Sequence, residues 1–165
     1  MYIISTSIII VLFLISALIW VETRNTTIVR IKKGQVMEFK SSMDLAGLPI
    51  ITFHQGKSKY NFLIDSGSSN TFINASVPIE HSSLKGTGQF FGSSGKIENV
   101  NVYDISLYYR DHKYDHIFRA ADLDNAFKEL KNRWGVQVHG IIGCDFMNKY
   151  KYCIDFKENV VYIRK

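Results

Sequence analysis

The 165-residue sequence lacks the patterns that mark several large classes of protein. It has only two cysteines, too few for a zinc ribbon, and its five histidines form no metal-binding motif. The net charge of +5 comes from scattered basic residues, without a basic helix that carries interleaved aromatic side chains. The sequence therefore predicts no metal or other cofactor and no nucleic-acid partner.

The few cysteines and histidines are expected to have structural or surface roles. Cys144 and Cys153 are predicted to be small buried residues, although a disulfide between them also remains open. His112 and His116 stand four apart in a stretch that alternates like a strand, and we expect both at the surface.

The amino-terminal segment contains no charged residue between Ile3 and Trp20. As a helix, residues 3–20 would extend about 27 Å, close to the thickness of the hydrocarbon core of a bilayer. No basic residue precedes the run and no clean cleavage site follows it, which favours an uncleaved anchor over a signal peptide. We therefore expect a single-pass transmembrane anchor over residues 1–24 and a folded domain over residues 25–165. The basic residues after the anchor favour the cytoplasmic side for this domain.

Alternation of apolar residues predicts a mainly β domain. Strands are expected at 26–32, 35–40, 48–54, 59–65, 71–73, 96–109, 114–121, 136–142, 152–156 and 160–164. A glycine-rich hairpin tip is expected at 92–95. Apolar residues at helical spacing predict a helix over 124–134, and one or two helical turns are expected at 144–149.

The most informative motif is Asp65-Ser66-Gly67, which directly follows the apolar residues 62–64. A buried strand that ends in this way presents a carboxylate on a tight turn, as an aspartic protease requires. That chemistry needs two carboxylates about 3 Å apart, which share one proton, activate a water molecule and polarise the scissile carbonyl. Because the motif occurs once, a single chain would hold half of a site.

Two stretches of the sequence resemble a known family. Residues 62–73 read Phe-Leu-Ile-Asp-Ser-Gly-Ser-Ser-Asn-Thr-Phe-Ile, and residues 140–147 read Gly-Ile-Ile-Gly-Cys-Asp-Phe-Met, followed by Tyr-Cys-Ile-Asp-Phe at 152–156. Together they resemble the active-site loop and the second signature of retropepsin-like aspartyl proteases, and the second stretch also resembles the end of a pepsin lobe. The resemblance covers residues 48–165, but not the anchor, the strands at 26–40 or the helix at 124–134.

The resemblance implies a retropepsin-like closed acid-protease barrel with one or two short helices, preceded by the transmembrane helix. Such a chain would act as a homodimer on a peptide or protein substrate. Asp65 would be the catalytic carboxylate, Ser66 would brace the loop across the dimer axis, and Gly67 would allow the partner chain to approach closely.

Other residues would support the loop or cover the substrate. The resemblance implies that Ile141, Ile142 and Gly143 support the active-site loop from below. It implies a flap formed by Gly92, Ser93, Ser94 and Gly95, with Phe90 and Phe91 as candidate substrate contacts. Asp145 and Asp155 match acids of the second signature, where structural hydrogen bonds are expected.

Two other interpretations of the motif stay open. The same fold could serve as a catalytically inactive binding or dimerisation module. Alternatively, Asp65 could merely cap a turn through its side chain in a membrane-tethered β domain. The side of the membrane also stays open, because bacterial proteins that this chain resembles are often exported.

Overall fold

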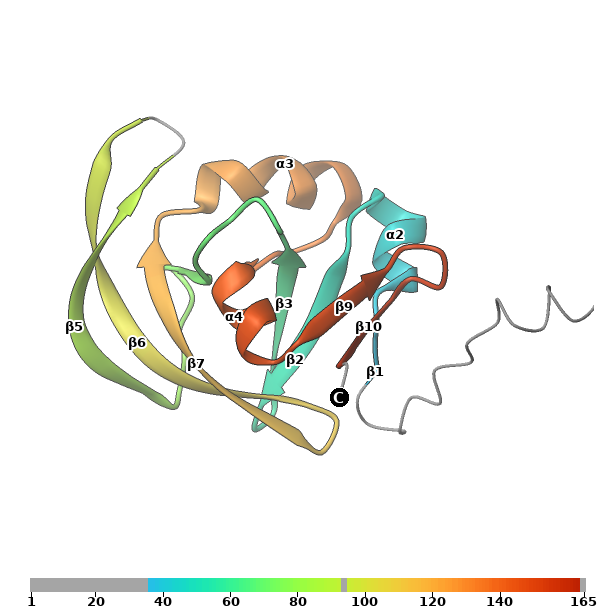
Figure 1. The fold of residues 1–165 in the computed structure, drawn as a ribbon. Coiled ribbons are helices and arrows are strands. Elements are labelled where there is room, and N and C mark those ends of the chain that lie inside the picture. The colour runs from blue at the N-terminus through green and yellow to red at the C-terminus, as the bar shows by residue number, and fades with distance from the viewer. Residues whose placement is uncertain (1–35, 93–94, 164–165) are drawn as a thin grey trace, which may run out of the picture. The chain divides into compact units, whose positions relative to one another are not determined.

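The structure, a computed structural model, describes residues 36–92 and 95–163 (Figure 1). The predicted anchor and the predicted strand at 26–32 lie outside these residues, as do Ser93 and Ser94 of the predicted flap. Among the described residues, no helix is long and apolar enough to cross a membrane.

The described part of the chain is mainly β, as predicted. Its strands are β1 (Val36–Glu38), β2 (Ile50–Gln55), β3 (Ser58–Ile64), β4 (Phe72–Asn74), β5 (Ser82–Phe91), β6 (Ile97–Tyr109), β7 (His112–Ala121), β8 (Gly140–Ile142), β9 (Tyr152–Asp155) and β10 (Val160–Ile163). Its helices are α2 (Lys40–Ala46), α3 (Asp124–Trp134) and α4 (Cys144–Lys149).

Six of the strands form a closed barrel. They pair in the order β2-β3-β8-β4-β7-β6, and β6 returns to β2 through the pair His54 and Tyr108. The seventh strand of this sheet, β5, pairs with β6 outside the ring, so that β5 and β6 form a long hairpin. A second, antiparallel sheet has the order β1-β10-β9.

Large apolar side chains from both sheets fill one core. Phe53, Phe62 and Phe118 of the barrel are fully buried, together with Phe146 of α4 and Val161 of β10. The rings of Phe53 and Phe62 meet edge to face with their centroids 5.8 Å apart, a favourable arrangement for aromatic pairs. The second sheet and α4 are therefore parts of the same folding unit as the barrel.

The helix predicted over 124–134 is confirmed, with the same bounds. Phe127 is its buried residue and packs with Ile50 and Val138 in a separate apolar cluster. The helix ends at Gly135, which adopts the left-handed conformation (φ +67°) that favours glycine after a helix. Helix α3, which the family resemblance does not cover, thus packs on apolar side chains on the outside of β2 and β8.

The prediction of one or two short helices is wrong, because α2 is a third helix within the described residues. The predicted strand at 35–40 is only Val36–Glu38, and the chain turns into α2 directly afterwards. The only large apolar residues of α2 are Met43 and Leu45, which stand two apart and not three or four, so the segment lacks the apolar periodicity that predicts a helix. Instead Ser42 Oγ donates to Phe39 O and accepts from Ile50 N–H, which fastens the helix to β2.

The strand predicted over 136–142 is shorter than expected, because only Gly140–Ile142 forms β8. Before it, Val136 and Val138 join the apolar cluster beneath α3. β8 runs parallel to β3 on one side and antiparallel to β4 on the other. A Cβ atom at Gly140 would lie 2.2 Å from the carbonyl oxygen of Phe72 and 2.6 Å from the ring of Phe62, so only glycine fits there.

Gly140→Ala should therefore destabilise the protein by roughly 1–3 kcal/mol, the usual cost of overpacking a tight core. The free energy of unfolding from urea denaturation measures this. Gly47→Ala is the comparison, because Gly47 has a left-handed backbone (φ +67°) that strains an alanine but open space around its Cβ position, so its loss reports backbone strain without a clash. A Gly140→Ala loss no larger than that of Gly47→Ala would contradict the close approach.

Candidate active site

Asp65 begins the loop of residues 65–71 that joins β3 to β4, here called the Asp65 loop (Figure 1). β8 lies between these two strands and so holds both ends of the loop. The Asp65 N–H donates to Ile142 O over 3.0 Å, which extends the β3–β8 pairing up to the acid. The backbone of Asp65 is thus fixed by the barrel, while the side chain is only half-buried.

The carboxylate of Asp65 is held by its own loop. Its Oδ1 accepts a hydrogen bond from the Gly67 N–H over 2.8 Å, and a Cβ atom at Gly67 would lie 3.1 Å from this oxygen. The backbone carbonyl of Asp65 accepts from Ser68 N–H over 3.2 Å. Ser66 and Gly67 are exposed, so the surface that they form is open to a second molecule.

Gly143 and the start of α4 pack against the Asp65 loop. A Cβ atom at Gly143 would lie 2.2 Å from Asn70 O, so the two backbones touch. The Cys144 N–H donates to Ser68 O over 2.8 Å, and the Cys144 thiol donates to Ser66 O over 3.1 Å. Ile141 and Ile142 pair with β3 as part of β8, so the structure brings all three predicted support residues to this loop.

Four polar side chains lie together beside the loop: Asp145, Thr71, His116 and Arg119. We call them the Asp145 cluster. Thr71 Oγ1 donates to Asp145 Oδ1 over 2.6 Å and accepts from Gly143 N–H over 3.1 Å. The other carboxylate oxygen, Asp145 Oδ2, lies 3.3 Å from His116 Nε2 and 3.8 Å from Arg119 Nη1. The cluster therefore joins α4 and β7 to the end of the Asp65 loop.

Asp145 remains ionised in this setting. Burial raises the pKa of its carboxyl group, but the close contact with His116 and the hydrogen bonds from Thr71 Oγ1 and the Phe146 N–H outweigh that effect and lower the pKa to about 2. The expected structural role of Asp145 is thus confirmed. Asp155 also makes structural bonds, because its Oδ1 accepts from Lys157 N–H and Glu158 N–H.

The prediction that His116 lies at the surface is wrong. Its side chain is only 8% exposed, and its ring packs against Phe146 with centroids 5.0 Å apart. Tyr114 and Phe118, two positions before and after it, are also buried on β7. This period of two was visible in the sequence and could have predicted that His116 faces inward. No sequence signal connected Thr71 or Arg119 to Asp145.

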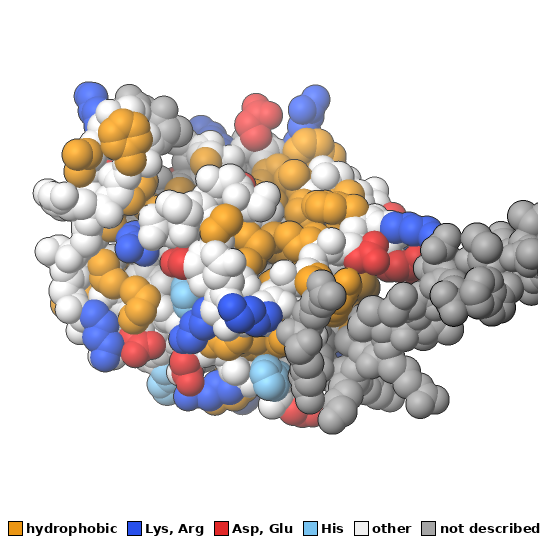
Figure 2. All heavy atoms as spheres, in the orientation of Figure 1, with side chains coloured by type: hydrophobic (Ala, Val, Ile, Leu, Met, Phe, Trp, Pro, Cys, Tyr) orange, Lys and Arg blue, Asp and Glu red, His pale blue; other side chains and the backbone are white. Residues whose placement is uncertain are grey.

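The predicted flap lies at the tip of the β5–β6 hairpin. Phe90 packs edge to face on Phe72 of β4, with ring centroids 4.9 Å apart, which ties the hairpin to the strand after the Asp65 loop. Phe91 is 73% exposed beside Ile97, its partner on β6, and Figure 2 shows hydrophobic side chains at this end of the hairpin. Gly95 N–H donates to Gly92 O, and the intervening Ser93 and Ser94 lie outside the described residues.

The cysteines, the metal-binding residue types and the cavity of the described residues form no further functional site next to Asp65. Cys144 and Cys153 are half-buried free thiols and form no disulfide. The described residues contain no group of three His, Cys, Asp or Glu side chains that could hold a metal ion. A cavity of about 760 Å³ lies between α3 and β3, but Asp65 does not line it.

Comparison of the chain with protein-family models gives no match, and comparison with curated proteins gives no significant match.

Asp145→Asn should lower the stability at pH 7 by roughly 2 kcal/mol, because Thr71 loses a charged acceptor and His116 and Arg119 lose the negative charge beside them. The folded-state pKa of about 2 lies below the ordinary 3.8. The carboxylate therefore stabilises the fold above about pH 4, and this contribution disappears as the pH falls towards 2. Unfolding curves between pH 2 and 7 should show that the free energy of unfolding falls less on acidification for the variant than for the unchanged chain.

Asp155→Asn is the control for this experiment, because the Asp155 carboxylate bonds, within the described part of the chain, only to the exposed backbone of its own turn. Equal effects of the two substitutions at every pH would show that the Asp145 cluster has no special role.

Proposed function

We propose that this chain is a retropepsin-like aspartic endopeptidase that hydrolyses peptide bonds as a homodimer, with one Asp65 from each chain. We further propose that residues 3–20 anchor it in a membrane as a single-pass protein. The observation that carries the proposal is a half-exposed carboxylate on a loop whose two ends and underside are fixed by β8 and α4. Such rigidity suits a group that must keep its position through a reaction.

The chemistry requires a second chain. Two Asp65 carboxylates about 3 Å apart cannot both ionise, so the pair holds one proton and titrates as a unit. The ionised carboxylate takes a proton from water as the water oxygen attacks the scissile carbonyl carbon. The protonated carboxyl donates its proton to the carbonyl oxygen, and collapse of the tetrahedral intermediate then releases the amine after it gains a proton. The exposed Ser66 and Gly67 leave room for the partner at this position.

The exposed hairpin gives the site a candidate cover. Phe90 contacts Phe72, so a substrate held by the hairpin would lie near the strand that leaves the Asp65 loop. The exposed Phe91 and Ile97 offer apolar surface to a substrate or to the partner chain. These contacts support an extended peptide as the substrate class.

One observation favours a second candidate function, an inactive binding or dimerisation module. The bond from Gly67 N–H to Asp65 Oδ1 is also the bond of a simple turn capped by a side chain. In that case the carboxylate would shape the loop without performing chemistry. Substitution of Asp65 by asparagine separates the two, because an asparagine side-chain oxygen accepts the same bond but cannot act as the acid–base pair.

Asp65→Asn should leave folding and pairing intact and lower peptide cleavage by about a thousandfold or more. Cleavage of a fluorogenic peptide mixture by the full-length chain in detergent measures the activity, and sedimentation measures the pairing. Undiminished cleavage by the variant would falsify the proposed function.

A mixing control tests whether both carboxylates are needed. When equal amounts of unchanged and Asp65→Asn chains exchange partners at random, activity per unchanged chain should fall to about half, because mixed pairs hold one acid. An unchanged activity per chain would mean that a single Asp65 suffices, against the shared-proton chemistry.

A further inference from the structure

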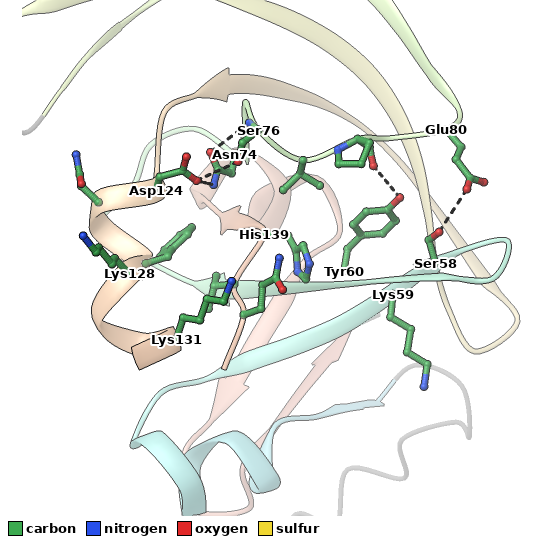
Figure 3. A pocket seen from close by; sticks show the side chains of 16 residues that line it. Ser58, Lys59, Tyr60, Asn74, Ser76, Glu80, Asp124, Lys128, Lys131 and His139 are labelled. Atoms are coloured by element: carbon green, nitrogen blue, oxygen red, sulfur yellow. Dashed lines mark hydrogen bonds between the residues drawn. The ribbon is translucent and has the colours of Figure 1, made fainter. Parts of the chain in front are cut away.

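The cavity beside α3 lies between this helix, the start of β3 and the segment 74–80 (Figure 3). Its volume of about 760 Å³ is in the range of small-molecule sites. Tyr60 lines it and precedes Asp65 by five residues of extended strand, or about 16 Å. A ligand in this cavity would therefore leave the Asp65 loop free.

His139 supplies a fixed hydrogen-bond donor to the cavity. Its Nδ1 accepts from Asn61 N–H over 2.9 Å, and its ring packs edge to face on Tyr60 with centroids 5.7 Å apart. Burial lowers the pKa of His139, so the ring is neutral at pH 7 and carries its proton on Nε2. Since Nδ1 is occupied and the residue lines the cavity, the Nε2–H is the polar group that it offers to a ligand.

Three lysines line the cavity, Lys128 and Lys131 of α3 and Lys59 of β3. Figure 3 shows Lys131 extending from α3 towards His139, whereas the side chains of Lys128 and Lys59 point away from it. No acid among the described residues lies within ion-pair distance of any of the three. The positive charges are thus available to a ligand.

The two acids of the cavity wall already have partners. Asp124 Oδ1 accepts from Asn74 Nδ2 over 2.7 Å and from Ser76 Oγ over 3.0 Å. Glu80 accepts from Ser58 Oγ over 3.4 Å, on the far side of Tyr60 in Figure 3. Both acids are therefore hydrogen-bonded to other residues of the cavity wall.

An apolar surface adjoins the charged one. Val77, which is half-buried, and Pro78, which is exposed, line the cavity together with the nearly buried Phe127 and Val138. A ligand that fits both surfaces carries an anion next to an apolar group.

We propose that the cavity between α3 and β3 binds a carboxylate with an adjoining apolar group, held by Lys131 and by the Nε2–H of His139. Such a group occurs in an acidic peptide segment and in a free carboxylic acid. The proposal is independent of the peptidase activity, because it uses no residue of the Asp65 loop.

Binding should be measured by calorimetry on the full-length Asp65→Asn chain, which cannot cleave its ligand through the proposed chemistry. The probes are the peptide acetyl-Glu-Leu-Glu-Leu-Glu-amide, the same peptide with glutamine for glutamate, and free 4-methylpentanoate. We expect saturable binding of the acidic peptide, the free acid or both, and no binding of the glutamine peptide. Binding of the peptide alone identifies a peptide segment as the ligand, and binding of the free acid alone identifies a small molecule.

Lys131→Gln should weaken the binding about tenfold through loss of one charged contact. His139→Asn should also weaken it, because asparagine keeps the acceptor for Asn61 N–H but removes the Nε2 donor. Lys157→Gln, at an exposed lysine outside the cavity, is the matched control and should change nothing. The proposal is wrong if neither acidic probe binds, if the glutamine peptide binds equally well, or if Lys131→Gln binds like Lys157→Gln.

Discussion

The insertion of β8 between β3 and β4 is the constraint on which the rest of the site depends. Two glycines make it possible, because a Cβ atom at Gly140 or at Gly143 would lie 2.2 Å from a backbone oxygen of the segment opposite. With β8 in place, the Asp65 N–H donates a hydrogen bond to Ile142 O. Cys144, at the start of α4, donates to the carbonyl oxygens of Ser66 and Ser68. A loop that would otherwise be exposed and variable becomes part of the barrel, and the position of the Asp65 carboxylate follows from the backbone.

This rigidity is distributed unevenly, and the distribution fits a site completed by a second chain. The inner side of the loop is held by Thr71, Gly143 and the ionised Asp145, whereas the outer side presents exposed Ser66 and Gly67. The hairpin repeats the pattern, with Phe90 packed on Phe72 and Phe91 open to solvent. In both places one side of the segment is packed within the chain, and the other side is exposed, where a partner chain or a substrate could bind.

The sequence predicted the features that depend on local patterns. The strands around Asp65, the glycine-rich hairpin tip and α3 follow from alternation, glycine turns and helical spacing, and the support given by Gly143 followed from a resemblance to a family. No strand was predicted at β5. α2 was missed because Ser42 holds it through a tertiary contact and no apolar stripe marks it. The Asp145 cluster was only partly foreseen, since its members come from three distant segments and meet through the closure of the barrel. The cavity beside α3 was not predicted either, because its lysines look like ordinary surface charges until His139 and Phe127 are placed beside them.

The central claim is that two Asp65 carboxylates form one catalytic pair. The most direct test is the binding stoichiometry, by calorimetry, of an inhibitor that mimics the tetrahedral intermediate of peptide hydrolysis. Such a compound binds a competent pair of acids far more tightly than a substrate does. The account predicts one inhibitor bound for every two chains. One inhibitor for each chain, or no binding to a folded and paired protein, would contradict it.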